Sequence, residues 1–370
     1  MKIIIDNSNI FAGGGIQVAT SFLYDLISIN TVDDFFVIQS PSSSKQINKS
    51  QFPENFHFFD LEEKDSSIFN RIKFVKAIEK NINPNVIFTT FGPSYHKSDY
   101  PKVVGFAIPF LIYFDSPFFS QISLISKIKL KILGSVKKYL FNRNSNVLIF
   151  ETDESRKIFN NLSKHKTKSY TVSNTLNEIF FNENKWVNYT LTNNSSFNIL
   201  CLTANYPHKN LKIIPYIIDI LVSRYKMKNF RFILSLSKSE LGFDDKYDSY
   251  VSYIGVININ QIPFLYKQIQ IVFMPTLLEV FSTTYLEAMY MGKPIISSDM
   301  SFAREICKDS ALYCKPLNID DYAKNIYKLK IDNSLYLNLV DKGKENIKRF
   351  GNSQERTQSY LSIIKLAALN

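Results

Sequence analysis

Short apolar stretches alternate with longer amphipathic stretches from one end of the chain to the other. The short runs are rich in β-branched residues, which is typical of buried strands, and the segments between them have the apolar spacing of helices. This alternation predicts an α/β protein whose parallel sheets are covered by helices on both faces. The first series of predicted strands comprises KIIID, DFFVIQ, VIFTT, KVVGFAI, NVLIFET and SYTVSN, and the second comprises FNILCLTA, RFILSLS, VSYIG, IQIVFMP, KPIISS and ALYCKP.

The two series are separated by a polar stretch without a clear period, NENKWVNYTLTNNSS at residues 182–196. A chain of 370 residues is also longer than a single hydrophobic core usually supports. We therefore predict two Rossmann-like domains, at residues 1–183 and 195–349. Residues 350–370 have helical spacing and are expected to form a helix that packs back on the first domain. Ligands of such sheets bind beyond the carboxyl ends of the strands, so two facing domains are expected to form a cleft.

Two carboxylates follow the predicted strand IQIVFMP. Glu279 falls in the loop after this strand, and Glu287 falls early in the next helix. The start of that helix, near Ser282 to Thr284, presents unpaired N–H groups that suit phosphate oxygens. Thr284 and Glu287 also have the three-residue offset of a capping box, a purely structural role. From the residues alone both interpretations of Glu287 stay open.

The same segment, EVFSTTYLEAMYMGKPIISSD, resembles the Glu, seven residues, Glu signature of the family-four retaining glycosyltransferases. The resemblance implies the GT-B fold and a nucleotide-sugar donor. It assigns Glu279 to the donor sugar, as a candidate catalytic residue, and Glu287 to the nucleotide ribose. Val280 stands where the family usually has a glycine, so the donor loop is expected to differ locally. The implied donor-binding residues of this segment are Phe281, Ser282, Thr283, Thr284 and Glu287.

A second motif, HKNL after the strand FNILCLTA, resembles the lysine-containing step of the same family. By this resemblance Lys209 binds the donor β-phosphate and stabilises the charge of the leaving diphosphate. The arginine that usually precedes this lysine is absent. His208 is a partial substitute in one interpretation and an ordinary surface residue in the other.

A glycine cluster stands between the first strand and the first helix. Glycine permits close approach of the backbone to a phosphate. The run GGGIQ resembles the glycine-rich loop of the phosphatidylinositol mannosyltransferase branch of the family. The resemblance places Gly14 and Gly15 at the donor diphosphate and Gln17 at the acceptor. The histidine that many relatives carry in this domain is missing from KVVGFAIPFLIYFDSP, where Tyr113 and Asp115 are polar alternatives.

The chain is basic, with a formal net charge of +11, which favours an anionic partner. The lysines gather in residues 120–143, an amphipathic stretch that suits anionic lipid headgroups or, alternatively, covers a sheet as an ordinary helix. No apolar run is long enough for a membrane span and no signal peptide is visible, so we expect a cytoplasmic protein, peripheral at the inner face of the plasma membrane. Cys201, Cys307 and Cys314 are expected to be reduced core residues.

Together these motifs predict a retaining glycosyltransferase that moves a sugar from a nucleotide-sugar to a hydroxyl of a glycan acceptor. The acceptor is expected to be lipid-linked, and the pathway to be the synthesis of a bacterial surface polysaccharide, O-antigen or capsule. The chain has no Asp-x-Asp motif, so we expect neither a metal nor another cofactor. A nucleotide-sugar 2-epimerase of the same fold is the main alternative. A basic nucleic-acid-binding protein is a weaker one, because no nucleic-acid-binding motif accompanies the charge.

Overall fold

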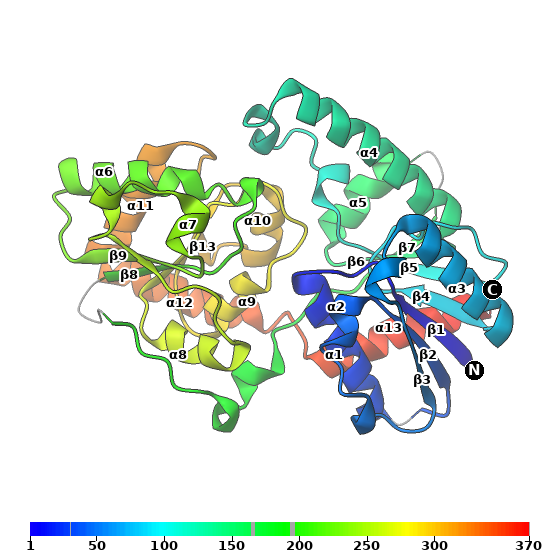
Figure 1. Ribbon diagram of the computed structural model, residues 1–370. Coiled ribbons are helices and arrows are strands. Elements are labelled where there is room, and N and C mark those ends of the chain that lie inside the picture. The colour runs from blue at the N-terminus through cyan, green and yellow to red at the C-terminus, as the bar shows by residue number, and fades with distance from the viewer. Residues whose placement is uncertain (30, 164–166, 193–196, 370) are drawn as a thin grey trace. The chain divides into compact units, whose positions relative to one another are not determined.

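The computed structural model describes residues 1–29, 31–163, 167–192 and 197–369, and the chain divides into two compact units (Figure 1). Unit 1 comprises Met1–Ile112, Leu124–Thr175 and Gly351–Asn370, and unit 2 comprises Tyr113–Ser123 and Leu176–Phe350. The chain thus passes into unit 2 after Thr175, before the expected linker at 182–196, of which residues 193–196 lie outside the described part. The segment Tyr113–Ser123 groups with unit 2, although it lies within the expected first domain.

Unit 1 is built on a parallel sheet with the strand order β3-β2-β1-β4-β5-β6-β7. The strands are β1 (Lys2–Asn7), β2 (Asp34–Gln39), β3 (Phe56–Asp60), β4 (Val86–Thr89), β5 (Lys102–Phe106), β6 (Val147–Phe150) and β7 (Lys168–Thr171). In the centre, Ile4 of β1 pairs with Phe36 of β2 and with Ile87 of β4. The strand order reverses between β1 and β4, so these two strands flank the topological switch point of the sheet.

Helices cover both faces of this sheet. They are α1 (Gly14–Ile29), α2 (Pro41–Ser44), α3 (Ile68–Ile82), α4 (Leu124–Asn144), α5 (Asp153–Leu162) and α13 (Ser353–Ala368). The C-terminal helix α13, red in Figure 1, packs beside α1, with the rings of Tyr360 and Phe22 5.7 Å apart. Arg356 of α13 donates a hydrogen bond of 2.7 Å to the side-chain oxygen of Asn174. On the opposite face, Val75 and Ile78 of α3 pack against the strands.

Helix α4 has its apolar side facing outward. Its buried residues are Gly134, Phe141 and Asn144, and a Cβ atom on Gly134 would lie 3.3 Å from the Leu111 side chain. The isoleucines and leucines that give the segment its helical period are instead largely exposed. The predicted stretch at residues 120–143 is helical from Leu124 onward, and its apolar stripe is exposed, so the alternative that this stripe covers the sheet is wrong. None of the helices in the described residues is long and apolar enough to cross a membrane.

Unit 2 has a second parallel sheet with the order β10-β9-β8-β11-β12-β13, which reverses between β8 and β11. Its strands are β8 (Phe197–Cys201), β9 (Phe230–Leu234), β10 (Val251–Tyr253), β11 (Ile271–Met274), β12 (Ile295–Ser298) and β13 (Ala311–Cys314). Its helices are α6 (Ile214–Ser223), α7 (Lys238–Leu241), α8 (Ile262–Lys267), α9 (Thr283–Tyr290), α10 (Ser301–Cys307), α11 (Ile319–Ile331) and α12 (Asn333–Ile347). The three cysteines are buried and free, as expected.

Close packing fixes the helix that follows β11. Gly343 of α12 lies against Met289 of α9, where an added Cβ would approach the Met289 side chain to 3.4 Å. The amide of Asn346 donates to the carbonyl oxygen of Ile306 at 2.8 Å and so joins α12 to α10. Because α12 packs against α9, the N-terminus of α9 has a defined position at the carboxyl edge of the sheet.

Candidate active site

The carboxyl ends of β8 and β11 form a pocket at the switch point of unit 2. Parallel α/β sheets bind ligands at such a point, because the loops after the two strands diverge there. The pocket is lined by Cys201, Leu202, Thr203, Lys209, Leu211, Phe273, Met274, Pro275 and Thr276. Of the residues that the sequence singled out, Lys209 lines this hollow directly.

The central feature of this site is an ion pair between Lys209 and Glu279. The Lys209 Nζ atom lies 2.5 Å from Glu279 Oε2, and the two side chains are only 16% and 17% exposed. Lys209 ends a 3-10 turn, Pro207–Lys209, after β8, and Asn210 then reverses the chain with a left-handed φ of 57°. Glu279 comes from the loop between β11 and α9. The fold thus brings together two residues that the sequence assigned to one donor site.

Hydrogen bonds hold the two loops against each other. The Leu277 amide donates to the carbonyl oxygen of His208 at 2.8 Å, beside the Lys209 turn. The hydroxyl of Ser116 donates to the carbonyl oxygen of Leu277 at 2.5 Å. Ser116 lies in the segment Tyr113–Ser123, which explains why that segment belongs to unit 2. No motif surrounds Ser116 in the sequence, so this contact could not be predicted from it.

His208 does not supply the positive charge of the missing arginine. Burial, together with the charge of Lys209, lowers the pKa of His208 to about 4, so the imidazole is neutral near pH 7. Its ring stacks on Tyr206, with ring centres 5.5 Å apart and an angle of 6° between the planes. The hypothesis that His208 partly substitutes for the arginine is therefore wrong as far as charge is concerned.

The N-terminus of α9 points its first turn toward the loop that carries Glu279. Ser282 is the N-cap residue and makes no side-chain capping bond, and Thr283 and Thr284 are the first two helical residues. Because Thr284 lies inside the helix, the capping-box interpretation of Thr284 and Glu287 is wrong. The first-turn N–H groups have no acceptor within their own helix, and they favour an anionic group at this position.

Glu287 lies on the inner side of α9 and is nearly enclosed, with 5% of its surface exposed. The Tyr266 hydroxyl donates to Glu287 Oε2 at 3.0 Å, and the Thr283 side chain also bonds to this carboxyl group. Burial raises the pKa of Glu287 to about 7, although both hydrogen bonds oppose the shift. Tyr266 was not found from the sequence, since a tyrosine in a short helix gives no signal. Phe281, another predicted donor contact, packs edge-on against Phe350 at 6.0 Å.

The remaining predicted residues lie in unit 1 or at the start of unit 2. Gly13 has a φ of +68°, and α1 begins at Gly14, where an added Cβ would meet no atom within 4 Å. Gly15 is tighter, because its Cβ would lie 3.5 Å from Ile10 and Phe91 side-chain atoms. Gln17 is exposed on the first turn of α1.

The two polar alternatives to the missing histidine differ in burial. Tyr113 is 3% exposed, and its ring lies 5.7 Å from that of Phe302. Asp115 is exposed. Tyr113 is therefore placed as a packing residue of unit 2.

Comparison with known families finds a match over part of unit 2. Residues 247–346, which include Glu279 and Glu287, match the family described as glycosyl transferases group 1. This stretch of unit 2 is similar to that family. The predicted resemblance is thus confirmed over the segment that carries both glutamates.

Relatives of this family extend the comparison. The O-antigen chain mannosyltransferase B of Escherichia coli is 25% identical over 112 residues, which cover 30% of this chain and 29% of that protein. Sucrose-phosphate synthase from Thermosynechococcus elongatus has a TM-score of 0.73 at 12% identity and covers 99% of this chain and 98% of its own. Anabaena HepE in complex with UDP-glucose has a TM-score of 0.69 at 14% identity, over 98% of this chain and 99% of its own. These structures share the fold, and the predicted GT-B class is confirmed.

Proposed function

We propose that the chain transfers a sugar, with retention of the anomeric configuration, from a nucleotide-sugar to a hydroxyl of a glycan acceptor. The observation that carries the proposal is the Lys209–Glu279 ion pair at the β8/β11 switch point, with the N-terminus of α9 following the same loop. A leaving nucleoside diphosphate gains negative charge as the glycosidic bond breaks. An ammonium group and unpaired N–H groups that are already in position stabilise this charge without reorganisation.

In this proposal the two charged residues have different tasks. Lys209 binds the diphosphate, and Glu279 orients Lys209 and stabilises the positive charge that develops at the anomeric carbon. A carboxylate held 2.5 Å from an ammonium is a weak nucleophile, so we favour this role over a covalent glycosyl-enzyme. The acceptor oxygen then bonds to the anomeric carbon on the face that the diphosphate leaves. A phosphate oxygen of the leaving group accepts the hydroxyl proton.

The proposed pathway is the assembly of a bacterial surface polysaccharide, with a lipid-linked acceptor. It is supported by the similarity of part of the chain to the E. coli protein named as an O-antigen mannosyltransferase. The HepE complex with UDP-glucose adds a second candidate donor type. We therefore give priority to nucleotide-activated mannose and glucose as donors.

A donor screen tests the proposal. Purified protein is incubated with radiolabelled nucleotide-sugars and lipid-linked glycans extracted from bacteria, and labelled glycan is separated from donor. We expect label in the glycan with one donor, an anomeric configuration equal to that of the donor, and loss of transfer in Lys209→Ala. An unlabelled glycan together with a donor sugar inverted at C2 would instead support the 2-epimerase alternative.

We further propose that unit 1 binds anionic membranes through the outward face of α4. The helix carries six lysine and arginine residues and no acidic residue. Its exposed apolar side chains are Leu124, Ile125, Ile128, Ile132, Leu133, Val136 and Tyr139. Apolar side chains that enter the headgroup region and lysines that meet anionic lipids are the two contributions to interfacial helix binding. Such binding brings the enzyme to a lipid-linked acceptor.

A further inference from the structure

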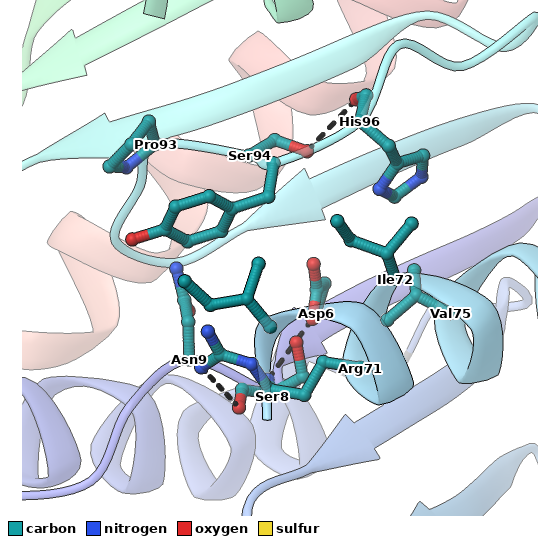
Figure 2. A pocket seen from close by; sticks show the side chains of 11 residues that line it. Asp6, Ser8, Asn9, Arg71, Ile72, Val75, Pro93, Ser94 and His96 are labelled. Atoms are coloured by element: carbon teal, nitrogen blue, oxygen red, sulfur yellow. Dashed lines mark hydrogen bonds between the residues drawn. The ribbon is translucent and has the colours of Figure 1, made fainter. Parts of the chain in front are cut away.

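Unit 1 has a pocket of its own at the β1/β4 switch point, and none of the assigned residues lines it. Figure 2 shows this pocket, which lies beyond the carboxyl ends of the two strands. Its polar lining includes Asp6 within β1 and Asn9 in the loop after this strand. Arg71 comes from α3, and His96 follows β4. The position is equivalent to that of the Lys209 pocket in unit 2, because both lie where the strand order reverses.

Arg71 is a buried cation that pairs with none of the described carboxylates. Its surface is 8% exposed, and its side chain runs from the first turn of α3 to the loop after β1 (Figure 2). Within the described residues the guanidinium donates one hydrogen bond, to the Ser8 carbonyl oxygen at 3.4 Å, and forms no salt bridge. The rings of Phe11 and Tyr95 lie 5.3 and 5.5 Å from its central carbon. Aromatic faces fix the plane of a guanidinium group while its N–H edge stays available for a two-point contact.

The acidic residues near the pocket are already engaged by other groups. Asp6 accepts hydrogen bonds from the Ser8 amide at 3.0 Å and from the Thr89 hydroxyl at 3.4 Å. Glu79 lies 2.6 Å from His96 Nε2 and 3.6 Å from Lys102 Nζ. Burial opposes ionisation of Glu79, but His96 and Lys102 hold the pKa of its carboxyl group below the usual value. Neither acid neutralises Arg71 directly, and an isolated buried charge is costly unless it is paired.

The side chain of Asn9 contributes a second polar group whose hydrogen-bonding capacity is not satisfied by the described residues. Its amide nitrogen donates to the Phe91 carbonyl oxygen at 2.7 Å, whereas its side-chain oxygen is buried and has no partner in the described part of the chain. A buried acceptor of this kind is stabilised by a hydroxyl donor from a ligand. The pocket therefore combines a donor edge for an anion with an acceptor for a hydroxyl group, on residues that are separate from the donor site of unit 2.

We propose that this pocket binds an anionic sugar, either a uronic acid or a sugar phosphate. The carboxylate or phosphate meets the N–H edge of Arg71 in a charge-assisted contact, and a ring hydroxyl donates to the side-chain oxygen of Asn9. The proposal goes beyond glycosyl transfer, since it concerns binding to unit 1 alone and does not depend on the nature of the donor.

Calorimetric titration of the full chain tests this inference. The probes are glucuronate, glucose 6-phosphate and the neutral methyl glucoside. The variants are Arg71→Gln, which keeps much of the side-chain size but removes the charge, Arg71→Lys, and Lys209→Ala as the control for anion binding in unit 2. We expect one of the two anions to bind, with affinity reduced at least about tenfold in Arg71→Gln and less in Arg71→Lys, and unchanged in Lys209→Ala. The preferred anion identifies carboxylate or phosphate as the ligand group.

Several outcomes would overturn the inference: no binding of either anion, equal binding to Arg71→Gln, or binding of methyl glucoside as tight as that of the anions. Loss of anion binding in Lys209→Ala would show that the anion binds at the donor site of unit 2. If Arg71→Gln unfolds at a lower temperature, the test relies on the wild-type chain. Its affinity for the anion must fall as the salt concentration rises, and methyl glucoside must not compete with the anion. Binding of UDP to each variant is measured in parallel, so failure of the donor site and failure of this pocket are distinguished.

Discussion

The Tyr266 hydroxyl donates a 3.0 Å hydrogen bond to Glu287 Oε2 and joins α8 to α9 in the core of unit 2. Tyr266 is fully buried and Glu287 is 5% exposed. The second glutamate of the motif is thus not a free carboxylate at the pocket surface. It is a nearly enclosed carboxyl group that stays protonated up to near-neutral pH. This property affects both stability and ligand binding.

The first prediction concerns pH. Burial raises the pKa of Glu287 from 4.5 to about 7, so between these values the folded chain holds a proton that the unfolded chain has lost. The resulting stabilisation is complete below the unfolded pKa and is lost as pH rises through the folded pKa. Glu287→Gln keeps the Tyr266 contact and removes the titration. We expect the wild type to lose on the order of 3 kcal/mol relative to Glu287→Gln between about pH 5 and pH 8.

Melting curves of both proteins at matched ionic strength measure this difference. Other groups titrate in the same range, but they are common to the two proteins and cancel in the comparison. A constant gap in melting temperature across the range would show that Glu287 does not carry the raised pKa.

Lys209→Ala tests the phosphate-binding cation. The change leaves the diphosphate without its ammonium partner in the transition state, and we expect turnover to fall at least about tenfold. It also leaves Glu279 without its partner, so a melting curve is recorded alongside the kinetics. Lys212→Ala, a nearby lysine on the exposed side of the same segment, is the matched control and should have wild-type kinetics. Near-normal turnover of Lys209→Ala would remove this residue from the site.

Much of the fold was predictable because buried parallel strands are continuous apolar runs in the sequence. All twelve strands that we expected are present, and β3 is an additional one. Its sequence, FHFFD, lies at the edge of the sheet and is only partly buried, so it lacks the signal of a central strand. The motif residues near Glu279 were found for a similar reason, since loop and helix are contiguous in sequence.

The supporting contacts were not predictable from the sequence. Ser116 bonds to the loop at Leu277 across 161 positions of sequence, and no local pattern marks such a pair. Arg71 lies four residues before Val75 on the buried face of α3, but an arginine at such a position gives no sequence signal of burial. Burial of polar side chains depends on tertiary packing, which is why the proposed anion pocket appears only in the structure.

Activity without added divalent metal is the third prediction. Lys209 and the N–H groups of α9 supply positive potential for the diphosphate, and the chain lacks the Asp-x-Asp motif of metal-dependent transferases. We expect turnover in EDTA to stay within about twofold of that in magnesium, a difference of less than 0.5 kcal/mol in activation free energy. Complete loss in EDTA that manganese or magnesium restores would contradict this expectation.

The fourth prediction concerns the outward face of α4. Liposome flotation compares the wild type with a variant in which Lys127, Lys131 and Lys138 are changed to Glu. Attraction to anionic lipid amounts to roughly 1 kcal/mol for each lysine near the surface, so the variant should lose flotation with anionic vesicles. Ile128→Ser with Ile132→Ser is a second variant, which tests the apolar contribution at unchanged charge. Equal flotation of wild type and the lysine variant, or no flotation of the wild type at low salt, would refute membrane binding by this helix.

The last prediction separates the two glutamates of the motif. Glu279 pairs with Lys209 beside the pocket, so Glu279→Gln should depress turnover and leave the affinity for nucleoside diphosphates nearly intact. Above about pH 7, where Glu287 is ionised, a ribose held by this residue should gain on the order of 1.5–3 kcal/mol of affinity from charged hydrogen bonds. Glu287→Ala should therefore weaken diphosphate binding by more than about tenfold, as calorimetric titration would show.

Glu287→Ala also leaves the buried Tyr266 hydroxyl without its hydrogen-bond acceptor. A lower melting temperature alone therefore does not identify a ribose contact. Tyr266→Phe is the matched control, because it removes the same hydrogen bond and keeps the carboxyl group. Its free energy of unfolding should fall by about 1–3 kcal/mol, but its affinity for the diphosphate should be retained. A ribose contact further requires the wild type to prefer UDP over its 2′-deoxy analogue, and Glu287→Gln to lose much of that preference. If Tyr266→Phe and Glu287→Ala weaken binding equally, Glu287 acts by holding α9 in place, and the ribose assignment is wrong.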